Sequence, residues 1–295
     1  MFEKIMQPIP NNADPDILHD GADYYLVSAI RSGELTFRGF QVYHSTDVTH
    51  WSEPRIVLDF KDFPWANAMG WAPSLRKFRD KYYLAFCADQ QIGLAVSDSP
   101  FGPFRDAVGA PLVKYNEFNN QTIDPCLFVD GDELYLFWGQ GKCWLAKLDV
   151  DNYPACRAEE PTLISAEFYW QSSSPLTFDG TIYNEAPDVI KIGDKYLLTW
   201  SIYDYRDARY SVRYAWADNV YGPYIQPRGD DMELDNILKK GHGSEQGTGH
   251  ACVVEYEGEY YLFYHRLTWP RQGYLRETCR GKIEFLPDGK LRMEA

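Results

Sequence analysis

The feature that most constrains the fold of this 295-residue chain is an internal repeat. Five segments align without gaps over their first ten positions, and each contains an apolar run, an acidic or glycine-containing turn and a second, aromatic run. The segments begin at Pro15, Pro73, Pro125, Pro187 and Ala251. Two such runs joined by a tight polar turn are typical of a β-hairpin. The repeat therefore indicates an architecture built from five equivalent units.

Further strands follow within the units. In four of them a third strand ends in an aspartate, at Asp47, Asp98, Asp149 or Asp218, and this recurrence favours a turn-forming role. Two units continue into Gly102-Pro103-Phe104 and Gly222-Pro223-Tyr224, which begin a fourth strand. Four strands in each of five units predict an all-β fold, a five-bladed β-propeller with four-stranded antiparallel blades around a central channel. A solenoid of repeats is the alternative, but near-equal units with aromatic strands favour closure into a ring. No Gly/Ser-rich or Pro-rich linker interrupts the chain, so we expect one domain over residues 1–295.

The residues just before the aligned position differ between the units. In a propeller the first strand of each blade lines the channel, so these residues converge at one mouth. Directly before the aligned position stand Asp14, Ala72, Asp124, Ala186 and His250, and one place earlier stand Ala13, Trp71, Ile123, Glu185 and Gly249. Taken singly, each polar member has an ordinary explanation as a turn cap, a surface carboxylate or an interior histidine. Their common level in the repeat marks them as a candidate site.

Three carboxylates crowded at a ring centre cost free energy unless they have a function. Glycoside hydrolysis requires two carboxyl groups, one protonated to release the leaving group and one ionised to activate water or to attack. A third anion nearby raises the pKa of the acid by repulsion. Trp71 is a candidate for stacking on a sugar face. The remaining histidines, which do not share this level, are interpreted as structural or surface residues: His19, His44, His50, His242 and His265.

Composition excludes several classes of partner. The net charge of −14 disfavours binding to nucleic acid and to anionic membranes, and no apolar run approaches the length of a membrane span. The N-terminus shows no apolar segment of a secretory signal. The six cysteines form no CxxC pair and no metal-binding spacing, and several lie in apolar runs, which indicates buried, reduced thiols. These features together predict a cytoplasmic protein.

The site residues also carry a family resemblance. In order, the motifs resemble the blade signatures of glycoside hydrolase family 43: Ala13-Asp14-Pro15-Asp16, Trp71-Ala72-Pro73, Ile123-Asp124-Pro125, Glu185-Ala186-Pro187 and Gly247-Thr248-Gly249-His250. The segments Ser97–Phe104 and Leu275–Thr278 are also similar to segments of that family. Each motif alone is weak, but five in the correct order and spacing, across nearly the whole chain, are strong.

The resemblance implies an inverting mechanism and a role for each residue. Asp14 would be the general base that activates water, and Glu185 the general acid that protonates the leaving oxygen. Asp124 would tune the pKa of Glu185 and orient the sugar, and Arg276 would hydrogen-bond sugar hydroxyls. His250 would lie beside a structural calcium ion in the central channel. No organic cofactor is expected.

The chain also departs from part of the family. Many members with xylosidase activity carry a β-sandwich after the propeller, whereas this chain ends at Ala295, soon after the fifth blade. The pocket is therefore expected to be closed by loops of the propeller, for which residues 30–38, 62–70, 165–181 and 269–274 are candidates. Their aromatic residues could form subsite walls or could pack the propeller itself: Phe63, Trp65, Phe168, Tyr169, Trp170 and Trp269.

The leading functional hypothesis is an exo-acting hydrolase that removes terminal pentoses from short arabino- and xylo-oligosaccharides. It would be an α-L-arabinofuranosidase with β-D-xylosidase activity alongside, and the exo mode follows from the predicted cytoplasmic location. Endo-arabinanase is an alternative specificity of the same site. A retaining, invertase-like mechanism is a second hypothesis. A sugar-binding propeller without turnover is a third, and the presence of all three carboxylates disfavours it.

Overall fold

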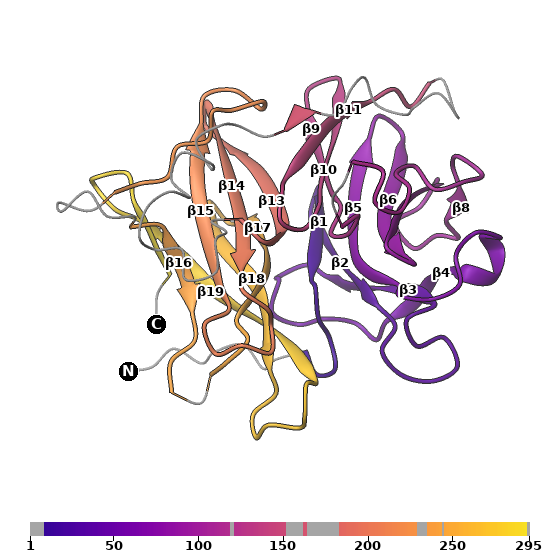
Figure 1. Ribbon diagram of the computed structural model, residues 1–295, viewed down its shortest axis with the longest axis horizontal. Coiled ribbons are helices and arrows are strands. Elements are labelled where there is room, and N and C mark those ends of the chain that lie inside the picture. The colour runs from indigo at the N-terminus through magenta and orange to yellow at the C-terminus, as the bar shows by residue number, and fades with distance from the viewer. Residues whose placement is uncertain are drawn as a thin grey trace.

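The computed structural model describes residues 9–118, 121–151, 162–163, 183–228, 235–243 and 245–293. In these residues, consecutive strands form five antiparallel sheets of four strands each. This arrangement confirms the predicted all-β, five-bladed propeller (Figure 1). The organisation of residues 1–295 as a single domain stays a prediction.

The blades follow one another along the chain. Blade 1 contains β1 (Asp16–Asp20), β2 (Asp23–Ala29), β3 (Gly39–Ser45) and β4 (Arg55–Asp59). Blade 2 contains β5 (Trp71–Phe78), β6 (Lys81–Ala88), β7 (Gln91–Ser97) and β8 (Arg105–Asp106). Blade 3 contains β9 (Cys126–Asp130), β10 (Glu133–Trp138), β11 (Trp144–Leu148) and β12 (Thr162–Leu163). Blade 4 contains β13 (Glu185–Ile192), β14 (Lys195–Ile202), β15 (Ser211–Ala217) and β16 (Ile237–Lys240). Blade 5 contains β17 (Gly249–Tyr256), β18 (Glu259–Leu267), β19 (Arg276–Phe285) and β20 (Leu291–Met293).

Helical structure in the described residues is confined to η1 (Phe60–Asp62), a single 3₁₀ turn after β4. No helix in this part of the chain is long and apolar enough to cross a membrane.

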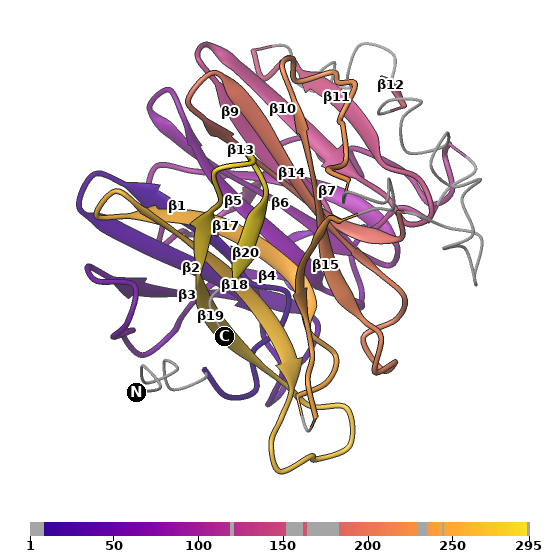
Figure 2. The same cartoon turned by 90° about the vertical axis from the view of Figure 1, so that its left-hand side faces the viewer.

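The first strand of each blade lies at the centre of the ring. β1, β5, β9, β13 and β17 contact one another in sequence, and β17 returns to β1. Figure 1 shows these strands gathered near the middle of the molecule, and Figure 2 shows the same strands from the side. The residues that open each first strand are thereby brought together, as the repeat predicts.

A local backbone feature recurs at the start of all five inner strands. The residue before the aligned position has a positive φ in every blade: 54° at Asp14, 43° at Ala72, 56° at Asp124, 59° at Ala186 and 45° at His250. Such a conformation costs a non-glycine residue roughly 1–2 kcal/mol. In blades 2, 4 and 5 the pairing register also shifts here, as at a β-bulge. A β-bulge changes the direction in which nearby side chains point. Side chains directly before the aligned position and side chains one place earlier can therefore face the same mouth of the channel.

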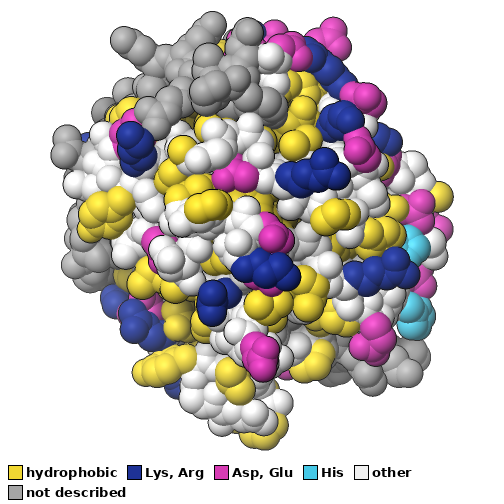
Figure 3. Space-filling model, turned by 90° about the vertical axis from the view of Figure 1, so that its right-hand side faces the viewer, with side chains coloured by type: hydrophobic (Ala, Val, Ile, Leu, Met, Phe, Trp, Pro, Cys, Tyr) yellow, Lys and Arg dark blue, Asp and Glu magenta, His cyan; other side chains and the backbone are white. Residues whose placement is uncertain are grey.

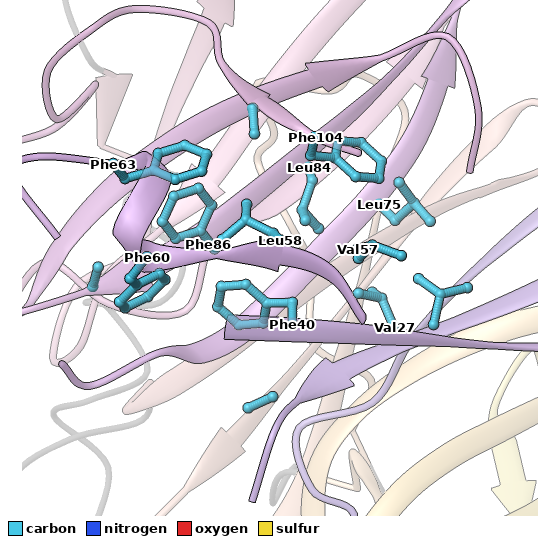
Figure 4. Packing of buried hydrophobic residues seen from close by; sticks show 14 of the residues in the cluster. Val27, Phe40, Val57, Leu58, Phe60, Phe63, Leu75, Leu84, Phe86 and Phe104 are labelled. Atoms are coloured by element: carbon cyan, nitrogen blue, oxygen red, sulfur yellow. The ribbon is translucent and has the colours of Figure 1, made fainter. Parts of the chain in front are cut away.

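Apolar side chains pack between neighbouring blades. Figure 4 shows the cluster between blades 1 and 2, in which Phe63 lies against Phe86 with ring centroids 5.4 Å apart. Trp65 stacks on Phe86 with ring centroids 5.8 Å apart, and its Nε1 donates a hydrogen bond of 2.8 Å to Asp106. Phe63 and Trp65 therefore pack the propeller and do not form subsite walls. Phe168, Tyr169 and Trp170 lie outside the described residues.

The ring is closed by a contact between the two ends of the described chain. Ile9 and Thr278 exchange two backbone hydrogen bonds, of 3.0 and 3.1 Å, so the segment before β1 adds to the start of β19. The Thr278 hydroxyl also donates a bond of 2.8 Å to Asn12 Oδ1. This closure holds the residues before β1 against blade 5, which is where Asp14 meets its partners.

The aspartates that end the third strands fall into two groups. Asp47 accepts backbone N–H bonds of 2.8 and 2.7 Å from Thr49 and His50, and Asp149 accepts one of 3.1 Å from Asp151, which confirms a turn-forming role for these two. Asp98 and Asp218 instead pair with lysines on neighbouring strands.

Figure 3 shows charged side chains of both signs interspersed on one face of the molecule.

The five described cysteines are buried and free, as expected: Cys87, Cys126, Cys143, Cys252 and Cys279. Burial raises the pKa of each of these thiols, so they stay protonated and unreactive. Cys156 lies outside the described residues.

Candidate active site

Asp14 lies at the channel mouth among basic side chains. It is only 5% exposed, and its Oδ1 accepts a hydrogen bond of 2.7 Å from Nη1 of Arg276. His265 Nδ1 lies 3.1 Å from the same oxygen, and His250 Nδ1 lies 3.5 Å away. Burial by itself would raise the pKa of Asp14, but the charge of Arg276 and the contacts with His250 and His265 together outweigh it and hold that pKa well below its ordinary value. Asp14 is therefore ionised at neutral pH, as a general base must be.

The surroundings of Glu185 raise its pKa, whereas those of Asp14 lower the pKa of Asp14. It opens β13, and its two oxygens accept hydrogen bonds from Gln140 Nε2 at 2.6 Å and from the Tyr210 hydroxyl at 2.8 Å. Burial raises the pKa of Glu185 to about 7, although these two hydrogen bonds act to lower it. The nearby Asp14 charge raises it further. A carboxyl group with this pKa can carry a proton to a leaving group near neutral pH.

Asp124 lies beside both of these groups. It is 6% exposed, and its Oδ2 accepts a hydrogen bond of 3.0 Å from the backbone N–H of Ala186. The sequence predicts a fixed anion at this position. In the structure, burial and the charges of Glu185 and Asp14 raise the pKa of Asp124 itself well above its ordinary value. Asp124 and Glu185 consequently compete for one proton and titrate as a pair.

His265, which the repeat pattern alone indicates to be structural or on the surface, belongs to the site. It is completely buried in β18, its ring stacks on Tyr210 at 5.8 Å, and it lies 6.0 Å from the ring of His250. Burial lowers the pKa of His265 to about 3 and also lowers the pKa of His250. Both imidazoles are neutral at physiological pH, so Arg276 is the cation that faces Asp14.

An aromatic wall supports Arg276. The guanidinium lies over the ring of Tyr205 at 4.2 Å, and Tyr205 in turn meets Tyr274 edge-on at 6.4 Å. Arg276 is 8% exposed, and its Nε has no hydrogen-bond partner in the described part of the chain. The guanidinium thus holds Asp14 with one nitrogen and keeps another donor unused.

Arg31 is a second residue that sequence reasoning did not single out. It follows β2 in the loop 30–38, and its guanidinium lies over Phe37 at 4.9 Å. Its Nε and Nη1 are buried and have no hydrogen-bond partner among the described residues. Burial lowers the pKa of Arg31, the neighbouring Arg276 lowers it further, and Asp14 opposes this shift. Arg31 therefore lies near the same group of charges and keeps two buried donors that no described residue satisfies.

The comparisons with known proteins now identify the family. The family model described as glycosyl hydrolases family 43 matches residues 5–291. The chain belongs to this family. A β-D-galactofuranosidase of Aspergillus niger is 27% identical over 285 aligned residues, in a match that covers 91% of this chain and 76% of that protein. A xylosidase/arabinosidase of Bacteroides ovatus is 27% identical over 296 aligned residues, in a match that covers 87% of this chain and 83% of that protein.

A solved structure shows the same fold. It is a family 43 β-xylosidase/α-arabinofuranosidase from a compost microbial metagenome, determined with xylotriose in a calcium-free form. Its TM-score is 0.74 at 23% identity, and the match covers 98% of this chain and 97% of that one. The family assignment makes this chain a glycoside hydrolase, which is a class that needs no organic cofactor.

Two further expectations for a family 43 enzyme concern the walls of the pocket. Trp71 opens β5 at the common repeat level and is half-buried. In the loop 269–274, Trp269 is 63% exposed, whereas Tyr274 packs against Tyr205. The loop 165–181 lies outside the described residues.

The calcium ion that the family resemblance placed beside His250 does not fit the groups found there. Calcium prefers six to eight oxygen ligands. The carboxylate oxygens near His250 Nδ1 are Asp14 Oδ1 at 3.5 Å, which is bound to Arg276, and Asp124 Oδ2 at 4.0 Å, which is bound to Ala186 N–H. Within the described ranges, no group of three or more His, Cys, Asp or Glu residues is placed to hold a metal.

Proposed function

We propose that this family 43 enzyme is an exo-acting, inverting glycosidase that removes terminal α-L-arabinofuranosyl residues, with β-D-xylosidase activity alongside. Its substrates would be short arabino- and xylo-oligosaccharides, met in the cytoplasm. The observation that carries the proposal is that two nearby carboxyl groups have opposite pKa shifts: Arg276 helps to keep the buried Asp14 ionised, whereas desolvation raises the pKa of the partly buried Glu185 to about 7.

These two states are the ones that an inverting hydrolysis requires. In the proposed step, Asp14 takes a proton from a water molecule as its oxygen attacks the anomeric carbon. Glu185 gives its proton to the glycosidic oxygen as that bond breaks. The product then has the opposite anomeric configuration, with the proton moved from Glu185 to the alcohol and another gained by Asp14.

The pentose specificity draws its support from the relatives. The Bacteroides ovatus protein is a xylosidase/arabinosidase, and the solved structure from the compost metagenome is a β-xylosidase/α-arabinofuranosidase. The exo mode is supported by the wall of Tyr205 and Tyr274 and by the loop that carries Arg31, which border the Asp14 side of the mouth. The Aspergillus niger relative favours β-D-galactofuranosides as a second candidate substrate.

The test is hydrolysis of a panel of aryl glycosides: α-L-arabinofuranoside, β-D-xyloside and β-D-galactofuranoside. We expect the highest kcat/KM on the arabinofuranoside and release of only the terminal sugar from arabino-oligosaccharides. Proton NMR of the first product should show inversion at the anomeric carbon. Retention would contradict the roles of Asp14 and Glu185, internal cleavage would indicate an endo-acting enzyme, and no turnover on any substrate would favour a sugar-binding propeller.

The competition between Asp124 and Glu185 predicts two opposite shifts in the pH profile. Activity needs protonated Glu185, so kcat/KM should fall as the pH rises through about 7. Asp124→Asn removes the neighbouring charge and should move this fall to lower pH. Tyr210→Phe removes a hydrogen bond that stabilises the ionised form, so it should move the fall to higher pH. The measurement is kcat/KM against pH, and shifts in the same direction would contradict this pairing.

The unused donors of Arg31 predict a role in substrate binding. Arg31→Ala should raise KM roughly tenfold and change kcat little, because a sugar oxygen would lose a hydrogen bond to a charged donor. Arg38→Ala is the matched control, since Arg38 is exposed on the same loop. Steady-state kinetics on the preferred aryl glycoside would distinguish the two. An unchanged KM in Arg31→Ala would show that its free donors face no substrate.

A further inference from the structure

A second charged cluster lies deeper in the channel, below the catalytic carboxylates. Arg76 Nη1 donates hydrogen bonds of 2.9 and 2.7 Å to the two oxygens of Asp16 and one of 2.8 Å to the carbonyl of Leu75. Its Nη2 lies 3.5 Å from Oδ1 of Asp188. The side chains are 16% exposed for Arg76, 9% for Asp16 and 6% for Asp188, so this is a buried ion cluster.

This cluster touches the inner strand of every blade. Asp16 comes from β1, Arg76 from β5 and Asp188 from β13. Asp188 also accepts a hydrogen bond of 2.9 Å from the backbone N–H of Val253 in β17, and its Oδ1 lies 3.7 Å from the Cys126 thiol in β9. A second bond ties the first two blades, since Leu75 N–H donates to Asp16 Oδ2 at 2.7 Å. One guanidinium therefore lies at the point where all five inner strands converge.

The position of Arg76 also divides the channel. The same side chain lines a cavity of about 400 Å³ at the other end, together with residues from the far halves of β1, β9, β13 and β17. Its guanidinium thus stands between that cavity and the catalytic level. A metal ion placed here would meet a fixed positive charge at close range, and the carboxylate oxygens of Asp16 are already bound to Arg76.

We propose that the Arg76 guanidinium is a built-in cation that joins the five inner strands in place of a channel metal ion. A guanidinium suits this task because its planar fork presents several donors to oxygens on different strands. The surrounding Cys126 and Cys252 are neutral thiols and add no charge. The carboxylates of Asp16 and Asp188 are the anions that Arg76 balances. This role does not depend on the glycosidase specificity proposed above.

The first test uses the wild-type protein and thermal unfolding. The midpoint Tm is measured in 5 mM EDTA, in buffer alone and in 5 mM CaCl₂ (concentrations on the order of those that saturate weak sites). We expect the same Tm in all three conditions. A Tm that falls in EDTA and returns with calcium would overturn the proposal, because it would show that the folded chain holds a stabilising metal ion.

The second test removes the guanidinium. Arg76→Ala leaves two buried carboxylates without a counter-ion and should lower Tm by roughly 10 °C. Calcium should then raise the Tm of this variant, because the vacated space is bordered by Asp16 and Asp188. Arg76→Lys keeps a charge and should show a smaller loss and no calcium response. Lys77→Ala is the control, since Lys77 follows Arg76 in β5 and its pair with Asp20 of β1 is partly exposed.

The outcomes separate cleanly. An Arg76→Ala variant as stable as the wild type, or one that gains no stability from calcium, would contradict the idea that Arg76 fills a cation position. If that variant does not fold, Arg76→Lys and the wild-type measurement decide. Glycosidase activity on the aryl panel is recorded separately, so failure of the proposed function would leave this stability comparison intact.

Discussion

Asp14→Ala is expected to lose roughly 10²- to 10⁴-fold in kcat on every substrate, including aryl glycosides with good leaving groups. The attacking water must be activated however easily the aglycone departs, so a better leaving group cannot compensate. Asp14 is also the group that Arg276 holds in its ionised state at 2.7 Å. The measurement is kcat on the aryl arabinofuranoside and on an arabino-oligosaccharide, side by side.

Two controls keep this result interpretable. Asp98→Ala removes a carboxylate whose side chain is 80% exposed and should leave kcat unchanged. Asp14→Asn keeps the size of the side chain, so a loss of activity in both Asp14 variants with an unchanged Tm points to chemistry and not to folding. If Asp14→Ala kept more than about a tenth of the wild-type activity, the base would have to be sought elsewhere.

Glu185→Ala is expected to give a loss that depends on the leaving group. On oligosaccharides, whose leaving alcohol needs a proton, kcat should fall roughly 10²- to 10⁴-fold. On aryl glycosides with acidic phenols the loss should be much smaller, because the phenolate departs without protonation. The fall in activity above about pH 7 should also disappear on the activated substrates, since the group that titrates there is gone.

This prediction is tested by plotting the logarithm of kcat against the pKa of the leaving phenol for both proteins. A steep dependence in the variant and a shallow one in the wild type is the expected pattern. Glu133→Ala, which removes a half-exposed carboxylate from blade 3, serves as the matched control. Equal losses on good and poor leaving groups would show that Glu185 is not the acid.

The repeat predicted the fold and the level of the site because both follow from symmetry. Once five equivalent hairpins close into a ring, the residues before each inner strand must meet at one mouth. The positive φ at Asp14, Ala72, Asp124, Ala186 and His250 shows that the equivalence extends to the backbone. Two of these positions hold alanine, so the conformation belongs to the fold, and the carboxylates use a geometry that every blade supplies.

A comparison limited to the first strand of each blade cannot identify site residues that lie elsewhere in the blades. The same comparison applied to the end of the second strand would have found three of them. Fourteen positions after the start of each repeat stand Ala29, Cys87, Gly139, Ser201 and His265. At the next repeat position blade 3 has Gln140, and one position later blade 1 has Arg31. Each differs from the residues at the same repeat position in the other blades. The register explains this, because His265 lies opposite Gly249, directly before His250.

Several properties of the site could not be deduced from the sequence. The rise in the pKa of Asp124 depends on how completely the fold buries it beside Glu185, and no spacing of residues encodes that burial. The contact of Arg276 with Asp14 joins residues 262 positions apart. Likewise, Phe63 and Trp65 are equally suited by sequence to a subsite and to the core, and only the packing against Phe86 distinguishes the two.

The separation of 262 positions between Asp14 and Arg276 has a consequence for the order in which the site is assembled during translation. Asp14 is translated before any blade is complete, and each blade is completed from one continuous stretch of chain. Arg276, which helps to keep Asp14 ionised, and Thr278, which anchors Ile9, are translated only with the fifth blade. A nascent chain with four finished blades therefore already contains all three carboxyl residues but lacks the guanidinium that binds Asp14. We therefore expect hydrolytic activity to appear only once the fifth blade has folded and Arg276 has bound Asp14.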